Sequence, residues 1–238
     1  MPEHPTHPTQ KTIAYSQIIH LSQIIHPEIP QWPGDPPVEF EKVADLDEDG
    51  YYLRRFSMGE HSATHMNAPN SFHPHSAGID AYPAESLVVP AVVINMLNLA
   101  ASNPDYVLAV DDVFKWEQKY GKIPQGSVVL LYTGWQDKWS DTNEFINQQH
   151  FPGFATATTQ FLLDERQITG VGIDTHGVDS GQDETFGTNH QVLSRRGIVL
   201  ENLTNLDQLP PLGTTLAIGI LRLRDGSGSP AAVMAFVP

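Results

Sequence analysis

The sequence predicts a strand-rich α+β fold in a single domain. Strand-like segments outnumber helix-like ones, and the helical patterns occur singly between the strands. The chain has 238 residues, 40% hydrophobic and 17% charged, which is enough apolar material for a sizeable core. No proline-rich, serine-rich or charged linker divides it, so we expect one domain over residues 17–238. The polar, proline-containing residues 1–16 are expected to form a flexible N-terminal arm.

The expected strands are short segments rich in β-branched and apolar residues. In chain order they cover residues 18–25, 51–58, 87–96, 127–132, 170–174, 198–200, 214–223 and 231–237. Three helices are expected between them, over residues 111–120, 154–166 and 188–197. The first has a clear start and stop, because Asp111 can cap its N-terminus and Gly121 follows its end.

The segment 60–75, EHSATHMNAPNSFHPH, holds four of the eleven histidines. His61, His65 and Asn67 are separated by even numbers of residues, so an extended backbone directs all three side chains to one side. Pro69 and Pro74 disfavour a helix here. The pattern therefore favours a metal site. Histidine pairs with this spacing also occur by chance on surfaces and in cores, and from local chemistry alone both interpretations stay open.

Further candidate residues follow other expected strands. Thr133, Gly134 and Trp135 come directly after one strand, where the indole can line a pocket for a planar substrate or pack as an ordinary core residue. Asp174 follows another strand and is a candidate for orienting its neighbours. Glu201 ends a third apolar strand, where an unpaired buried carboxylate is costly.

These features together resemble the cyclase / kynurenine formamidase-like family of metal hydrolases. The segment from His61 to Ser71 is similar to the family motif His-x-Gly-Thr-His-x-Asp-x-Pro-x-His, with Ala63 for Gly, Asn67 for Asp and Ser71 for the last His. Other matches are spread through most of the chain, in the same order as in the family: residues 32–36 (WPGDP), 132–135 (YTGW), 172–174 (GID), and the pair His190 and Glu201.

The resemblance implies a swivelling β/β/α fold, an obligate homo-oligomer (dimer or tetramer), and metal-activated water that hydrolyses an amide. It implies metal ligation by His61, His65, Asn67, His190 and Glu201. The ion would be Zn²⁺, or alternatively Mn²⁺. In the family the motif aspartate bridges two metals, so the neutral Asn67 favours one.

The remaining functional expectations concern the substrate and the catalytic base. Ser71 stands at the family's base position, and His73, two residues on, is the nearest replacement. Glu201 is a ligand or a base. Trp32, Trp135 and Asp174 are expected to contact the substrate.

The family-implied substrate is a small aromatic N-formyl compound such as N-formylkynurenine, whose conversion to kynurenine belongs to tryptophan catabolism. Two alternatives stay open: a hydrolase of cyclic amides or lactones, and a non-catalytic metal-binding protein on the same fold.

Composition limits the partners. The formal net charge of −15 disfavours nucleic acids and anionic membrane surfaces. The chain has no cysteine, so disulfides, thiolate ligands and a thiol nucleophile are excluded. No long apolar run or charged leader pattern is visible, which makes a cytoplasmic location the expectation.

Overall fold

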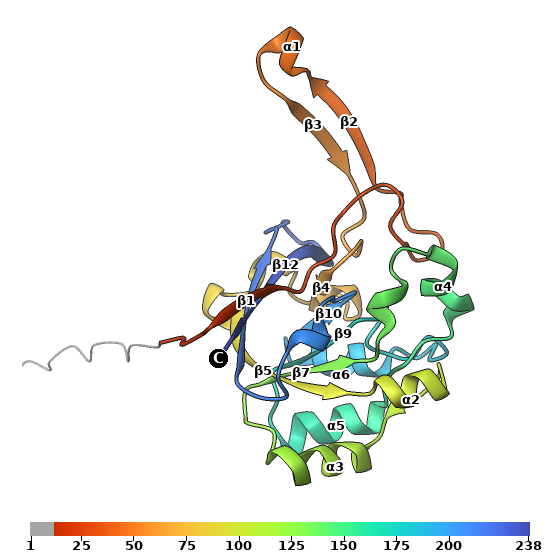
Figure 1. Ribbon diagram of the computed structural model, residues 1–238, viewed down its shortest axis with the longest axis vertical. Helices are drawn as coiled ribbons and strands as arrows, with labels where there is room; N and C mark the ends of the chain where they lie inside the picture. The colour runs from red at the N-terminus through yellow and green to blue at the C-terminus, as the bar shows by residue number, and fades with distance from the viewer. Residues whose placement is uncertain (1–11) are drawn as a thin grey trace, which may run out of the picture.

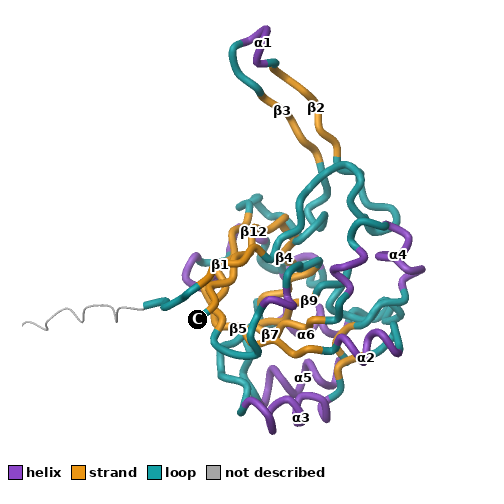
Figure 2. Tube along the Cα trace, in the orientation of Figure 1, coloured by secondary structure: helices purple, strands orange, loops and turns teal. Residues whose placement is uncertain are grey.

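The computed structural model describes residues 12–238 (Figures 1 and 2). The predicted N-terminal arm lies mostly outside the described residues. The last residues of this arm contact the C-terminal end of the chain. The Tyr15 ring packs against Phe236 with centroids 5.0 Å apart, and the Ser16 amide donates to the Val237 carbonyl at 2.8 Å.

An eight-stranded mixed sheet forms the centre of the molecule, in the order β1-β12-β11-β5-β7-β9-β10-β4. β4 also pairs with β12, so the sheet closes on itself with β1 outside the ring. β5, β7, β9 and β10 run parallel, and the other pairings in this sheet are antiparallel. The strands of this sheet are β1 (Gln17–His20), β4 (His65–Asn67), β5 (Val88–Asn95), β7 (Val128–Tyr132), β9 (Gly170–Ile173), β10 (Ile198–Glu201), β11 (Thr214–Ile220) and β12 (Gly228–Val237).

The strands of the closed sheet contribute alternate side chains to two hydrophobic cores. On β7, Val128 and Leu130 belong to the core enclosed by the sheet, whereas Val129 and Leu131 face the core beneath the helices. All five β7 residues are buried, as expected for a central parallel strand covered on both faces.

Three helices, α3 (Val110–Tyr120), α5 (Thr156–Glu165) and α6 (Gly187–Ser194), pack their buried residues into the core on the outer side of this sheet. α2 (Leu97–Ser102) follows β5, and α4 (Thr142–Ile146) packs Phe145 into a separate cluster with Trp135 and Phe151. α3 and α5 lie side by side, where the Phe114 and Phe161 rings meet with centroids 5.4 Å apart (Figure 1). A small parallel pair, β6 (Val107–Leu108) and β8 (Gly153–Phe154), lies in the connections between these elements.

A separate antiparallel hairpin projects from the body. It consists of β2 (Glu39–Ala44) and β3 (Leu53–Ser57), with the short helix α1 (Leu46–Asp49) at its tip (Figure 1). We call residues 39–57 the arm. The sequence predicts a strand near β3, but it does not predict that β2 and β3 form a hairpin that projects from the rest of the molecule.

Candidate active site

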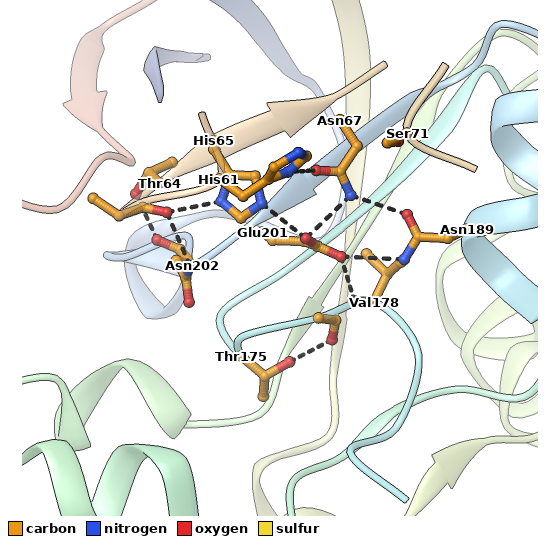
Figure 3. Close-up of polar contacts among 12 residues, drawn as sticks. His61, Thr64, His65, Asn67, Ser71, Thr175, Val178, Asn189, Glu201 and Asn202 are labelled. Atoms are coloured by element: carbon orange, nitrogen blue, oxygen red, sulfur yellow. Dashed lines mark hydrogen bonds and ion pairs between the residues drawn. The ribbon is translucent and has the colours of Figure 1, made fainter. Parts of the chain in front are cut away.

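The functional side chains meet where β4, β10 and the start of α6 come together (Figure 3). β4 pairs with β10 in antiparallel register, which places His65 opposite Glu201. The motif is extended only from His65 to Asn67. Before it, the chain turns through Ala63, whose φ of 54° is a left-handed conformation that suits the glycine of the family motif better than alanine.

The Ala63 turn fixes the orientation of the His65 ring. The Ala63 carbonyl accepts hydrogen bonds from His65 Nδ1 at 2.9 Å and from Asn202 Nδ2 at 2.9 Å. His65 Nδ1 therefore carries a proton, and Nε2 is directed into the site. A backbone acceptor on the far nitrogen is the usual support of a metal-binding histidine.

Glu201 is the central acceptor of the site. Its Oε2 lies 2.9 Å from His65 Nε2 and accepts from Asn67 Nδ2 at 3.1 Å, while Oε1 accepts from the Val178 amide at 2.9 Å. Burial alone raises the pKa of Glu201, but the hydrogen bond and positive charge of His65 and the Val178 amide outweigh it and lower the pKa to about 2. Glu201 is therefore a carboxylate at neutral pH.

Two asparagines extend the network toward α6. Asn67 Nδ2 also donates to Asn189 Oδ1 at 3.0 Å, and Asn189 Nδ2 donates to Asp179 Oδ2 at 2.9 Å. Asp179 accepts the Thr188 and Asn189 backbone amides at 2.6 and 3.1 Å, which anchors the first turn of α6. These contacts hold both amide side chains in fixed orientations.

His61 completes the cluster from the other side. Its Nδ1 lies 2.9 Å from Asn67 Oδ1, and its Nε2 lies 2.9 Å from Ser227 Oγ, which in turn contacts Glu60 Oε2 at 2.7 Å. The ring packs so tightly against Gly228 that a Cβ there would approach the His61 ring to 2.7 Å. Burial and the nearby His65 charge lower the pKa of His61.

A cavity of about 320 Å³ opens over this cluster. The cluster of His61, His65, Asn67 and Glu201, which we call the polar end, lines it, as do four further acidic residues: Asp35, Asp179, Asp183 and Glu184. Other walls carry aromatic side chains, namely Trp32, Phe72, Phe151, His176 and Phe186. A volume near the lower end of the usual range for ligand pockets suits a small planar molecule.

The structure brings four of the predicted ligands together and separates the fifth. His61, His65, Asn67 and Glu201 form one network, but His190 is exposed and contacts the rings of Phe72 and His73, with centroids 5.2 Å away in each case. Asn189, one position earlier on α6, points into the site instead. The structure thus places Asn189 rather than His190 in this network, because one residue along a helix turns the side chain by about 100°. Metal ligation by His190 stays a prediction.

The predicted catalytic residues are only partly in place. Ser71 lines the cavity and its Oγ donates to the Ala68 carbonyl at 2.5 Å. His73 is not among the residues that line the cavity, and its Nε2 lies 2.9 Å from the His190 carbonyl. Residues 69–71 form a 3₁₀ turn rather than the extended segment that would face His73 toward the metal. The structure therefore places His73 outside the cavity lining, and its role as the base stays a prediction.

Of the three predicted substrate contacts, only Trp32 lines the cavity. Trp135 is a core residue whose Nε1 donates to the Phe145 carbonyl at 2.8 Å. Asp174 is fully buried and accepts the Thr133 amide at 3.0 Å and the Thr133 hydroxyl at 2.7 Å, so it holds the turn after β7. Neither Trp135 nor Asp174 lines the cavity, so their expected substrate contacts stay predictions that this arrangement does not favour.

Sequence reasoning missed Asn189 and three aromatic wall residues, namely Phe72, Phe151 and Phe186. A signal for Asn189 was available, because Val192 and Leu193 define the buried face of α6 and Asn189 lies on that face, three and four positions earlier. His176 and Phe151 become recognisable only when the loops after β9 and α4 fold over the cavity.

Within residues 12–238, no group of three or more His, Asp or Glu side chains is arranged to hold a metal ion. Among the helices of residues 12–238, none has the length and hydrophobicity that a membrane span requires.

The closed sheet and its histidine–carboxylate cavity define the class of protein. The family model described as "Putative cyclase" matches residues 19–180, and the chain belongs to this cyclase family. Isatin hydrolase of Roseibium aggregatum is 31% identical over 93% of this chain and 92% of its own length. Kynurenine formamidase of Bacillus thuringiensis is 26% identical over 90% of this chain and 95% of its own. The structure of isatin hydrolase A from Ralstonia solanacearum superposes with a TM-score of 0.88 at 32% identity, covering 93% and 92% of the two chains.

Proposed function

We propose that this protein is a hydrolase that uses one divalent cation to cleave the C–N bond of a small aromatic amide. The observation that carries the proposal is the buried His65–Glu201 pair at the polar end of a cavity with aromatic walls. The 31% identity to an isatin hydrolase and the 26% identity to a kynurenine formamidase support this reaction class. Isatin is a bicyclic aromatic lactam and N-formylkynurenine an aromatic formamide, so one pocket chemistry suits both.

The donors in the cavity suit one cation. His65 Nε2 and Glu201 Oε2 lie 2.9 Å apart, a separation that two ligands at ~2.0–2.2 Å from a shared ion can adopt. The Asn67 carbonyl oxygen is a neutral third donor. His61 becomes the fourth donor when one of its ring nitrogens gives up its hydrogen bond, to Asn67 or to Ser227, and binds the ion instead. Zn²⁺ suits two imidazoles with a carboxylate, and Mn²⁺ becomes the better ion as oxygen ligands increase.

A second cation is disfavoured. The two asparagines contribute no charge, and among residues 12–238 Glu201 is the one carboxylate that contacts His65 and Asn67. Asp179 is engaged by the α6 amides and Asn189. The charge needed to hold two ions close together is therefore absent from these contacts.

The cation, when bound, supplies water with a pKa lowered to ~7 and polarises the substrate carbonyl. The protein side chains position the substrate and exclude water from the cavity. Trp32 and Phe151, whose ring centroids are 6.3 Å apart, bound the cavity where the aromatic ring of the substrate would lie. Asn67 and Asn189 can hydrogen-bond its polar atoms. Glu201 contributes its negative charge, which offsets that of the cation.

Hydrolysis of a cyclic aromatic amide is the second candidate activity, and the higher identity to isatin hydrolase than to kynurenine formamidase favours it. The predicted lactone substrates and a non-catalytic role are the remaining alternatives. The expected cytoplasmic location and the exclusion of nucleic acid and membrane partners stay predictions.

The test combines metal content with turnover. Purified protein loaded with Zn²⁺ or Mn²⁺ is analysed by elemental mass spectrometry and assayed on isatin, formanilide and N-formylkynurenine. We expect close to one ion per chain and turnover of at least one substrate. His65→Ala should lose most of the ion, whereas His20→Ala, at an exposed position on β1, should retain it. Full ion binding without turnover of any compound would leave the non-catalytic alternative, and unchanged metal content in His65→Ala would remove His65 from the ligands.

A further inference from the structure

His176 is a buried polar side chain that the proposed chemistry does not use. It follows β9, is 8% exposed, and its ring lines the cavity. Its Nε2 is shielded from solvent and has no hydrogen-bond partner among the described residues. A buried polar atom without a partner costs about 1–3 kcal/mol, so an atom left in this state inside a cavity indicates a partner that arrives with a ligand.

The surroundings of His176 are aromatic. Its ring meets the edge of Trp32 with centroids 5.7 Å apart, and that of Phe145 at 5.2 Å. Burial, followed by the charge of His65, lowers the pKa of His176 to about 4, so the imidazole is neutral at pH 7. A neutral imidazole has one ring nitrogen without a proton, and in the tautomer protonated on Nδ1 this nitrogen is Nε2. Nε2 is then an acceptor.

We propose that His176 Nε2 accepts the N–H of the bound aryl amide and thereby selects amides and lactams over lactones. This inference rests on the proposed function and names the substrate class for the same cavity. The aromatic ring would lie against Trp32 and Phe151, with its carbonyl at the polar end and its N–H toward His176. Access to Nε2 needs a rotation of the imidazole, because this atom is shielded from solvent.

The test measures equilibrium binding to metal-free protein, which separates recognition from turnover. The probes are oxindole, a bicyclic lactam with an N–H, its N-methyl derivative, and benzofuran-2-one, the matching lactone. Dissociation constants are obtained by calorimetry. One net hydrogen bond corresponds to roughly a two- to tenfold preference for oxindole over the other two in the wild type.

Variants at position 176 then show whether the preference for oxindole depends on His176. His176→Phe keeps the aromatic volume and should bind all three probes equally. His176→Gln keeps an acceptor near the position of Nε2 and should recover the preference for oxindole. His20→Phe, an exposed site on β1, should behave as the wild type. Circular dichroism confirms that each variant folds, and the comparison of probes in the wild type decides the question even if a variant does not.

Each outcome has a separate meaning. Equal binding of oxindole and N-methyloxindole by the wild type overturns the inference and leaves the proposed function in place. An oxindole preference that persists in His176→Phe does the same. Failure of the wild type to bind any probe overturns the inference and leaves the proposed function to the separate test of metal content and turnover.

Discussion

At the scale of single residues, Asn67 explains how the buried cluster of His61, His65 and Glu201 is hydrogen-bonded when no cation is bound. It donates to Glu201 through Nδ2 and lies 2.9 Å from His61 Nδ1 through Oδ1, so it satisfies a carboxylate and an imidazole at once. An aspartate has no donor for Glu201. The asparagine therefore lets this buried cluster exist as a closed hydrogen-bonded network, which a second carboxylate would disrupt.

Asn67→Asp should bind the cation more tightly and be less stable without it. In EDTA the new carboxylate faces Glu201 Oε2 across the present 3.1 Å contact, and we expect a loss of about 1–3 kcal/mol in the free energy of unfolding. Zn²⁺ or Mn²⁺ should reverse the loss and raise the metal affinity or stoichiometry above that of the wild type. Thermal melts and metal titrations check both effects, with the exposed Asn98→Asp as the control. Equal stoichiometry and affinity would place Asn67 outside the ligand set.

His73→Ala should have little effect on turnover. The side chain lies outside the lining of the cavity and contacts the His190 carbonyl, so its loss does not remove a group from the reacting atoms. We expect kcat to fall by less than about tenfold, compared with the ~10²–10⁴-fold that removal of a general base costs. Steady-state kinetics on the best substrate measure this. A decrease within the larger range, with unchanged metal content, would restore His73 as the base.

At the scale of elements, the ends of the parallel strands are tied together through Asp174. This carboxylate, at the end of β9, binds the Thr133 turn after β7. Burial outweighs these hydrogen bonds and raises the pKa of Asp174 to about 6. Between pH 4 and 6 the folded protein therefore keeps a proton that the unfolded chain has released, so this group makes stability fall as the pH rises.

Asp174→Asn should remove that pH dependence. From the model value of 3.8 to about 6, the stability of the wild type relative to the variant should decline by about 3 kcal/mol, because each pH unit contributes about 1.4 kcal/mol. Denaturant unfolding at pH 4, 5, 6 and 7 measures the difference between the two proteins. Asp164→Asn, which alters a surface carboxylate paired with Arg195, provides the comparison. Parallel curves for the wild type and Asp174→Asn would show that Asp174 ionises normally in the fold.

The elements with strong local patterns were predictable, and the relations between them were not. The expected helix at 111–120 corresponds to α3, and the expected strands at 87–96 and 127–132 correspond to β5 and β7, because their apolar runs and end signals are local. Closure of the sheet depends on the pairing of β4 with β12, far apart in sequence. No local pattern encodes that contact.

The same limit explains the site. The His61, His65 and Asn67 spacing is a local signal, and the structure brings all three together even though a turn at Ala63 replaces the expected extended backbone. Whether Asn189 or its neighbour faces the cavity depends on how α6 packs. That orientation follows from tertiary contacts rather than from residue type.

At the scale of the whole molecule, the arm is a two-stranded hairpin that projects from the body, so its own strand pairing contributes little stability. A lone two-stranded hairpin is marginally stable in water. The arm nevertheless exposes six large apolar side chains: Val43, Leu46, Tyr51, Tyr52, Leu53 and Phe56. An exposed apolar surface of this kind usually marks an interaction site. We propose that a second copy of the chain covers the arm, which accords with the homo-oligomer that the sequence resemblance implies.

Removal of the arm should therefore change the oligomeric state. We expect the wild type to have at least twice the mass of one chain in light scattering coupled to gel filtration. A variant with residues 39–57 replaced by a short Gly-Ser linker should have the mass of one chain. Val43→Asp with Tyr52→Asp should weaken association without deleting backbone, because two charges on the exposed apolar surface disfavour its burial. Leu221→Asp, at an exposed apolar site away from the arm, should leave the mass unchanged. A wild type that remains a single chain at high concentration, or an armless variant with the wild-type mass, would show that the arm is not an interface between copies.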